Sequence, residues 1–123
     1  MKLLAAVIAC ALLLAGCGGS GQSESDGGLG QDPSQPVTVN IVIKGGKVTP
    51  QGERVNVKVG QKITLHVTSD ASEEVHVHST PEHEYQLKPG DDKTYSFSIK
   101  VPGQVAVEAH HLDVTIAQLV VRP

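Results

Sequence analysis

From residue 37 onward, apolar and polar residues alternate almost one by one along the chain. Val and Ile fill the odd positions of residues 37–44, and the same period of two returns at 55–59, 63–67, 75–77, 95–99 and 105–109. The last run, 115–121, is mostly apolar. A period of two places successive side chains on opposite faces of a strand, whereas no window shows the 3.6-residue period of a helix. The pattern predicts an all-β domain.

Turn-forming residues separate these runs and set their number. Gly45-Gly46, Gly60, Pro89-Gly90 and Pro102-Gly103 each stand between two alternating segments. Short strands with turn signals at this spacing are typical of a sandwich of two antiparallel sheets. We therefore expect seven or eight strands.

The first residues have a different character. Lys2 precedes an almost wholly apolar run over 3–15, and the chain continues as Leu14-Ala15-Gly16-Cys17. The run is shorter than the roughly 20 residues of a membrane-spanning helix and is typical of a secretory signal. Its end resembles the lipobox of bacterial lipoproteins. The resemblance implies a signal peptide at 1–16, cleavage before Cys17 and a lipid on that cysteine, including a palmitate-type acyl chain. An unlipidated signal peptide or an uncleaved anchor is the alternative.

Residues 17–36 form the predicted lipidated cysteine and flexible linker, and residues 37–123 form the predicted domain. The linker is rich in Gly, Ser, Gln, Asp and Pro, with Leu29 as its sizeable apolar side chain, so it buries too little surface to fold. About 19 flexible residues have a root-mean-square reach of about 25 Å. We expect the domain to be tethered to the cell membrane on its extracytoplasmic side.

Composition excludes several functions. Cleavage would remove Cys10, and lipid would occupy Cys17, so no thiol would remain for a cysteine nucleophile, a disulfide or a Cys-ligated metal. The net charge is −3, and the aromatic residues are Tyr85, Tyr95 and Phe97, which argues against a nucleic-acid surface. No arrangement of Ser, His and Asp shows the spacing of a catalytic site. We expect no enzymatic activity.

The order of the segments resembles the cupredoxin-like domains of bacteria over nearly all of residues 37–123. The matching pieces are VKVGQKITLHVTSD at 57–70, EVHVHS at 74–79, LKPGDDKTYSFSI at 87–99 and VPGQVAVEAHH at 101–111. The middle of the chain is most similar to a branch that carries His-Val-His. The resemblance implies a Greek-key β-sandwich.

A type 1 copper site needs two His, one Cys and usually a weak axial Met. The resemblance assigns the Cys to the position of Ala109, the downstream His to that of Leu112 and the first His to that of Val75. The predicted mature chain has no Met either. We therefore expect no type 1 copper electron transfer.

Six histidines are many for a small domain, and most lie in two segments. His76 and His78 are two residues apart on one predicted strand, and Glu108 and His110 are two residues apart on another. In the topology that the resemblance implies, these strands are neighbours, and cross-strand side chains lie about 5 Å apart. Three imidazoles and one carboxylate can bind Zn(II) or Cu(II).

The competing interpretation is an ordinary polar sheet face, which is the commoner case. His83, expected in the loop after Pro81, and His111 are candidate outer ligands. We expect His66 to face solvent. The acidic residues around the histidine segments are expected to form a solvated rim: Glu73, Glu74, Glu82 and Glu84. The alternative is that the segment Glu82-His83-Glu84 supplies an outer ligand.

Two functions remain open at this point. One is a tethered lipoprotein that binds, buffers or hands over Cu(II) or Zn(II). The other is a non-metal interaction module whose face docks another envelope or transporter protein. Metal content of the purified protein would separate them.

Overall fold

The computed structural model describes residues 34–123, so the predicted signal peptide and Cys17 lie outside the described residues. Within this range the chain is all β, with nine strands and no helix. The strands are β1 (Val37–Lys44), β2 (Lys47–Thr49), β3 (Glu53–Lys58), β4 (Lys62–Ser69), β5 (Glu73–Val77), β6 (His83–Leu87), β7 (Asp91–Ser98), β8 (Gly103–Ala109) and β9 (Val114–Arg122). The fold class is as predicted, but the strand number of seven or eight is wrong. The short β2 and the polar β6 have little apolar alternation to reveal them.

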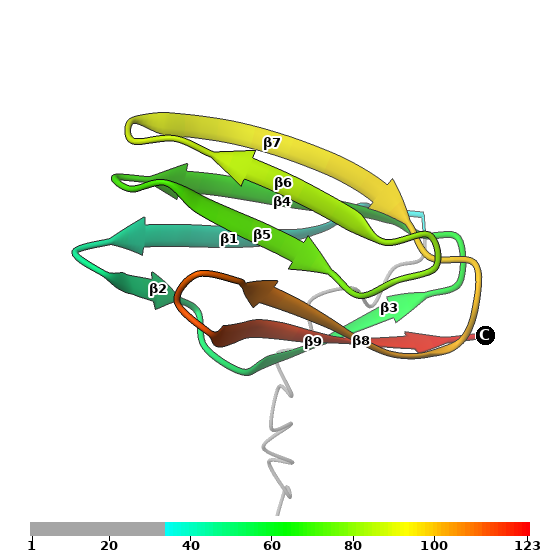
Figure 1. Cartoon of the computed structure of the whole chain (residues 1–123). Coiled ribbons are helices and arrows are strands. Elements are labelled where there is room, and N and C mark those ends of the chain that lie inside the picture. Colours follow the sequence, from blue (N-terminus) through cyan, green and yellow to red (C-terminus); the bar gives the residue numbers. More distant parts are fainter. Residues whose placement is uncertain (1–33) are drawn as a thin grey trace, which may run out of the picture.

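The nine strands form two packed sheets of a Greek-key sandwich (Figure 1). One sheet has the order β2-β1-β4-β7, and the other has the order β3-β9-β8-β5-β6. Five of the seven strand pairs are antiparallel, as expected, whereas β1–β4 and β3–β9 are parallel. The chain passes between the sheets before it returns beside these strands, and such crossovers permit parallel neighbours.

The period of two determines which side chains fill the space between the sheets. β1 alternates strictly between buried and exposed residues, and β5 is buried at Glu73, Val75 and Val77. The inward-facing Val, Ile and Leu side chains of both sheets form one apolar core. Their burial provides the main stabilisation of residues 34–123, which contain no cysteine.

Aromatic rings close the side of the sandwich where the edge strands β6 and β7 lie beside each other. The rings of Tyr85 and Tyr95 stack with their centroids 4.0 Å apart, and the ring centroids of His83 and Phe97 are 5.0 Å apart. Burial, and then the proximity of Tyr95, raise the pKa of Tyr85. The prediction that His83 lies in a loop is therefore wrong, because it begins β6 and packs within this aromatic row.

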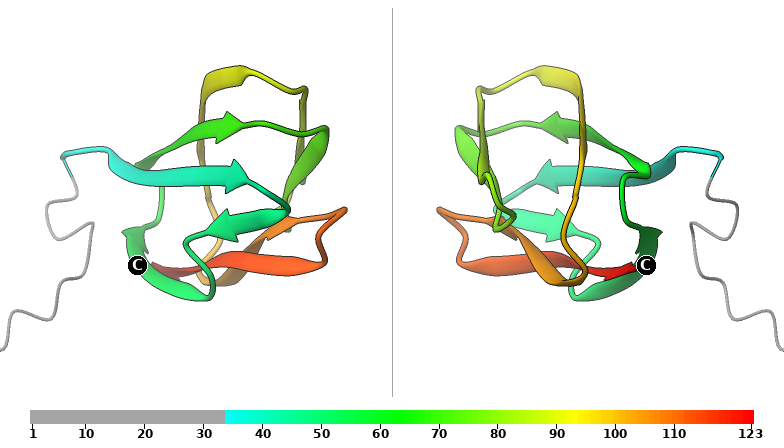
Figure 2. Two further views of the ribbon diagram at one scale, coloured as in Figure 1. Left: turned by 90° about the vertical axis from the view of Figure 1, so that its left-hand side faces the viewer. Right: turned by 90° about the vertical axis from the view of Figure 1, so that its right-hand side faces the viewer.

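The described chain enters and leaves the domain at the same end, as Figures 1 and 2 show. Gln61, which is buried, donates a hydrogen bond of 2.8 Å to the carbonyl of Gln35 and holds the entering segment against the domain. Residues 34–123 include no helix of the length and apolarity needed to cross a bilayer.

Candidate metal centre

The pairing of β5 with β8 brings the two histidine-bearing segments together, as the sequence predicts. Val75 lies opposite Ala109, and His76 lies opposite Glu108. Val75 and Ala109 are fully buried, so the alternate residues His76 and Glu108 point away from the core. The prediction that these strands are neighbours and share an outward polar face is confirmed.

His76 and His78 lie against each other on this face. Residues two apart on a strand are separated by about 6.6 Å along it, but the two rings lean together and stack with centroids 4.1 Å apart. Each ring has a carboxylate partner. His78 Nε2 lies 2.7 Å from Glu108 Oε2, and His76 Nε2 lies 3.1 Å from Glu82 Oε2.

His110 follows β8 and approaches His76 from the other direction. Its backbone N–H donates to the carbonyl of Glu74 over 2.9 Å, and its ring centroid lies 6.4 Å from that of His76. The Glu74 carboxylate accepts a hydrogen bond from the side chain of Gln86 on β6. His110 and Glu74 therefore flank His76 on the side away from His78.

Two sets of potential ligands result. The ligand atoms of His76, His78 and Glu82 lie within 4.8 Å of one another, and so do those of Glu74, His76 and His110. We use the name histidine face for the surface formed by these side chains together with Glu108: Glu74, His76, His78, Glu82, Glu108 and His110.

The charge of the histidine face is negative when its imidazoles are neutral. It carries the carboxylates of Glu74, Glu82 and Glu108, and Glu84 lies directly opposite His76 on the neighbouring strand β6. The sequences of β5, β6 and β8 contain neither Lys nor Arg. A bound cation would offset the repulsion among these carboxylates.

Two members of the histidine face, Glu74 and Glu82, were expected to lie in the solvated rim, and Glu82 was a ligand only in the alternative. Glu74 shares the strand phase of His76 and His78, so the period of two contains the signal that could have identified it. Glu82 reaches His76 because the chain reverses between β5 and β6. No local pattern shows that contact.

Two predicted outer ligands lie elsewhere. His83 pairs with Val77 and so takes the core-facing side of the sheet, among Tyr85 and Phe97. His111 directs Nδ1 toward Glu73 at 3.4 Å and belongs to neither ligand set. The structure brings His76, His78, Glu108 and His110 together, but not His83 or His111.

Glu73 contradicts the predicted solvated rim, because only 2% of its surface is exposed. Its Oε1 accepts the backbone N–H groups of Glu74 at 2.8 Å and His111 at 2.7 Å. Its Oε2 accepts the N–H of Leu112 at 3.2 Å. Three N–H donors compensate the burial of the carboxylate. Glu73 thereby fixes the β8–β9 loop, which carries His110, to the start of β5.

The positions that the resemblance assigns to type 1 copper ligands hold apolar side chains. Val75 and Ala109 face each other inside the core, and Leu112 packs against it. None of these side chains has an atom that can bind a metal. These residues do not fit a type 1 copper ion.

His66 lies on the other sheet, where its ring is partly exposed and its Nε2 lies 2.7 Å from Asp92 Oδ1.

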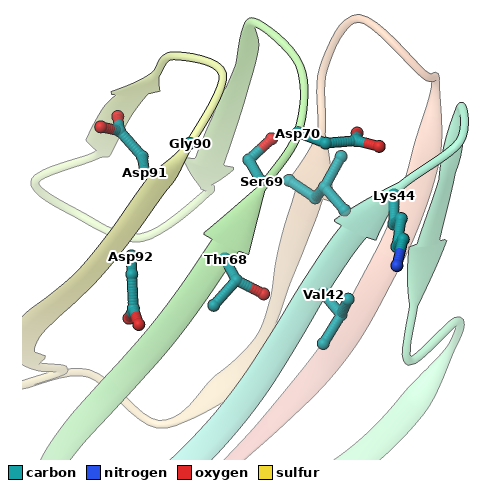
Figure 3. A pocket seen from close by; sticks show the side chains of 9 residues that line it. Val42, Lys44, Thr68, Ser69, Asp70, Gly90, Asp91 and Asp92 are labelled. Carbon is teal, nitrogen blue, oxygen red and sulfur yellow. The ribbon is translucent and has the colours of Figure 1, made fainter.

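Asp92 also lines an open hollow of about 470 Å³ (Figure 3). The other two acidic residues there also have partners. Asp70 accepts a hydrogen bond from the backbone N–H of Gly45. Asp91 accepts hydrogen bonds from the Lys93 side chain and from the backbone N–H of Lys88, and these two bonds, the first more than the second, lower its pKa. The hollow therefore presents no unpaired carboxylate for a ligand.

Comparison with known proteins identifies the fold. No family model and no curated protein matches the sequence. Dithionite-reduced auracyanin from the photosynthetic bacterium Roseiflexus castenholzii has a TM-score of 0.52 and 13% identity, with 70% of this chain and 97% of auracyanin covered. An oxidised methionine-to-leucine variant of amicyanin has a TM-score of 0.50 and 17% identity, with 68% and 81% covered. These likenesses show that the domain has a cupredoxin-like fold.

The Glu73 interactions generate a stability prediction. In Glu73→Gln one acceptor oxygen becomes an NH₂ group that faces an N–H donor. We expect the free energy of unfolding to fall by about 1–3 kcal/mol, measured by urea denaturation. Glu84→Gln, at an exposed position of β6, is the matched control and should leave the midpoint nearly unchanged. Equal midpoints for Glu73→Gln and the parent protein would show that Glu73 does not hold the loop.

Proposed function

We propose that this chain is a membrane-tethered, extracytoplasmic lipoprotein whose cupredoxin-like domain binds and buffers Cu(II) or Zn(II) at the histidine face. The observation that carries the proposal is that His76 belongs to two groups of three ligand-type side chains, and that the ligand atoms within each group lie within 4.8 Å of one another. An ordinary polar sheet face needs only cross-strand pairs. His76 lies in two groups of three ligand-type side chains, which is more than cross-strand pairing alone requires.

The spacing of the ligand atoms is compatible with a transition-metal ion. Ligand atoms about 2.1 Å from a tetrahedral ion are about 3.4 Å apart. Atoms that lie within 4.8 Å of one another reach that geometry through rotations of partly exposed side chains. Imidazole together with carboxylate suits Zn(II) and Cu(II) better than Ca(II) or Mg(II), which prefer oxygen ligands alone.

The carboxylates of the histidine face also orient the rings. When Nε2 donates to a carboxylate, Nδ1 keeps the lone pair that a metal needs. The 2.7 Å contact of His78 with Glu108 has this arrangement, so Glu108 supports His78 instead of completing a ligand set. His76 and Glu82 have the same contact at 3.1 Å, and Glu82 can exchange its role as hydrogen-bond partner for that of ligand.

The proposed role is ion binding, not electron transfer or catalysis. The apolar Val75, Ala109 and Leu112 leave no type 1 copper site, and the histidine face uses the opposite side of the same two strands. The lipobox-like run that ends at Cys17 and the Gly/Ser-rich linker support the tethered location. A tethered domain would bind ions close to the extracytoplasmic surface of the cell membrane, because the anchor would keep it from diffusing away.

The anchoring proposal predicts the behaviour of Cys17→Ala. This variant should lose incorporation of a palmitate analogue and should leave the membrane fraction, because the proposed lipid is attached to the Cys17 sulfur. Cys10→Ala, within the same signal segment, should keep both label and membrane location. Labelled Cys17→Ala protein would contradict lipidation at this residue.

The metal proposal predicts ligand-dependent stabilisation. At a free ion concentration about one hundred times Kd, Zn(II) or Cu(II) should stabilise the detergent-solubilised mature protein by about 2.7 kcal/mol, measured by thermal denaturation. His76→Ala/His78→Ala should abolish this increase, because both rings belong to the histidine face and neither is in the core. Binding should weaken at acidic pH, because a protonated imidazole has no lone pair to offer a metal ion.

His66→Ala is the control for this experiment. It removes an imidazole that is also paired with a carboxylate, but on the other sheet, and should leave metal binding unchanged. If calorimetry at neutral pH finds no site tighter than millimolar for either ion, the metal proposal fails. The interaction module then becomes the better account of the histidine face.

A further inference from the structure

The two ligand sets of the histidine face share one residue. The outer set contains His76, His78 and Glu82, and the inner set contains His76, Glu74 and His110. The side chain of His76 is 13% exposed, compared with 39% for His78 and 60% for Glu82. His76 is thus the protected centre of an arrangement whose other ligands lie on both sides of it.

We propose that the histidine face is a transfer site, in which one divalent ion occupies two overlapping positions and exchanges between them while His76 stays bound. The inference rests on the proposed function. It adds that the ion has two alternative ligand sets, and that His76 is the ligand common to both.

The chemistry of imidazole limits the face to one ion at a time. A neutral imidazole has one nitrogen that carries a proton and one that offers a lone pair. His76 can therefore bind an ion in the outer set or an ion in the inner set, but not both at once. The expected stoichiometry is one ion per chain, although five side chains provide ligands.

The same geometry permits movement without full release. In the proposed exchange, an ion leaves His78 and Glu82 and acquires Glu74 and His110, the other members of the second set, while it remains bound to one nitrogen of His76. Each set provides three protein ligands, and a tetrahedral ion then keeps a fourth position open to water or to a ligand from another molecule. Structural zinc sites have four protein ligands and are closed, so this arrangement favours exchange over retention.

The neighbouring contacts are consistent with two positions. Glu108 orients His78 in the outer set through its 2.7 Å contact, and the side chain of Gln86 orients Glu74 in the inner set. Each set therefore has its own supporting residue. The Glu73 carboxylate holds the loop that carries His110 in place, because it accepts hydrogen bonds from the backbone N–H groups of His111 and Leu112.

The test is titration calorimetry of the detergent-solubilised mature protein with Cu(II) and, separately, Zn(II). The single variants His78→Ala and His110→Ala each remove one set and leave the other. Each should still bind one equivalent, and the association constant should fall only about twofold if the two positions are equally populated, because the observed constant is their sum. His76→Ala and the double variant His78→Ala/His110→Ala disrupt both sets.

We expect His76→Ala and the double variant to lose at least about a hundredfold in affinity, since even residues that only orient metal ligands cost up to that factor. Electron paramagnetic resonance provides an independent readout with Cu(II). The spectra of His78→Ala and His110→Ala should differ from each other, and the parent spectrum should contain both components. Circular dichroism confirms that each variant is folded, and His66→Ala serves as the unchanged control.

Three results would overturn the inference while the proposed function stands. The first is complete loss of binding in either single variant, and the second is a stoichiometry of two ions. The third is a parent Cu(II) spectrum that matches the spectrum of one single variant and contains no component of the other. Absence of any site tighter than millimolar in the parent protein is a different result. It would remove the proposed function and this inference together.

Discussion

The register between β5 and β8 is the constraint on which the rest of the site depends. Val75 lies opposite Ala109 inside the core, and His76 lies opposite Glu108 on the outer face. A slip of one residue in either strand would turn its polar side chains into the core. The burial of valines and alanine therefore fixes the histidine face, although the apolar residues contact no ligand.

A buried carboxylate reinforces this register at one end. Glu73 has the inward phase of Val75, and in place of an apolar contact it binds backbone N–H groups from the β8–β9 loop. That loop begins with His110 on the outer surface and continues to Leu112 against the core. Glu73 thus positions the loop that carries both His110 on the histidine face and Leu112 against the core.

The sequence predicts most of the fold and four of the six side chains of the histidine face, and the difference has a physical basis. Strand alternation depends on neighbours along the chain, so it correctly predicts that His76 and Glu108 face outward. The burial of Glu73 depends on N–H donors from distant residues, and the contact of Glu82 with His76 depends on the turn before β6. His83 was misplaced because its strand packs through aromatic rings from another sheet, which the local sequence does not show.

The location of the histidine face on an outer sheet surface supports the proposed exchange of an ion. A site between core residues is enclosed by the packed interior, and its ligands are fixed by that packing. The ligands here project from an outer sheet surface, with His78 and Glu82 substantially exposed. A second molecule can reach them without opening the fold. In the proposed transfer site, exchange would require only side-chain rotation, while β5 and β8 keep the backbone of His76 in place.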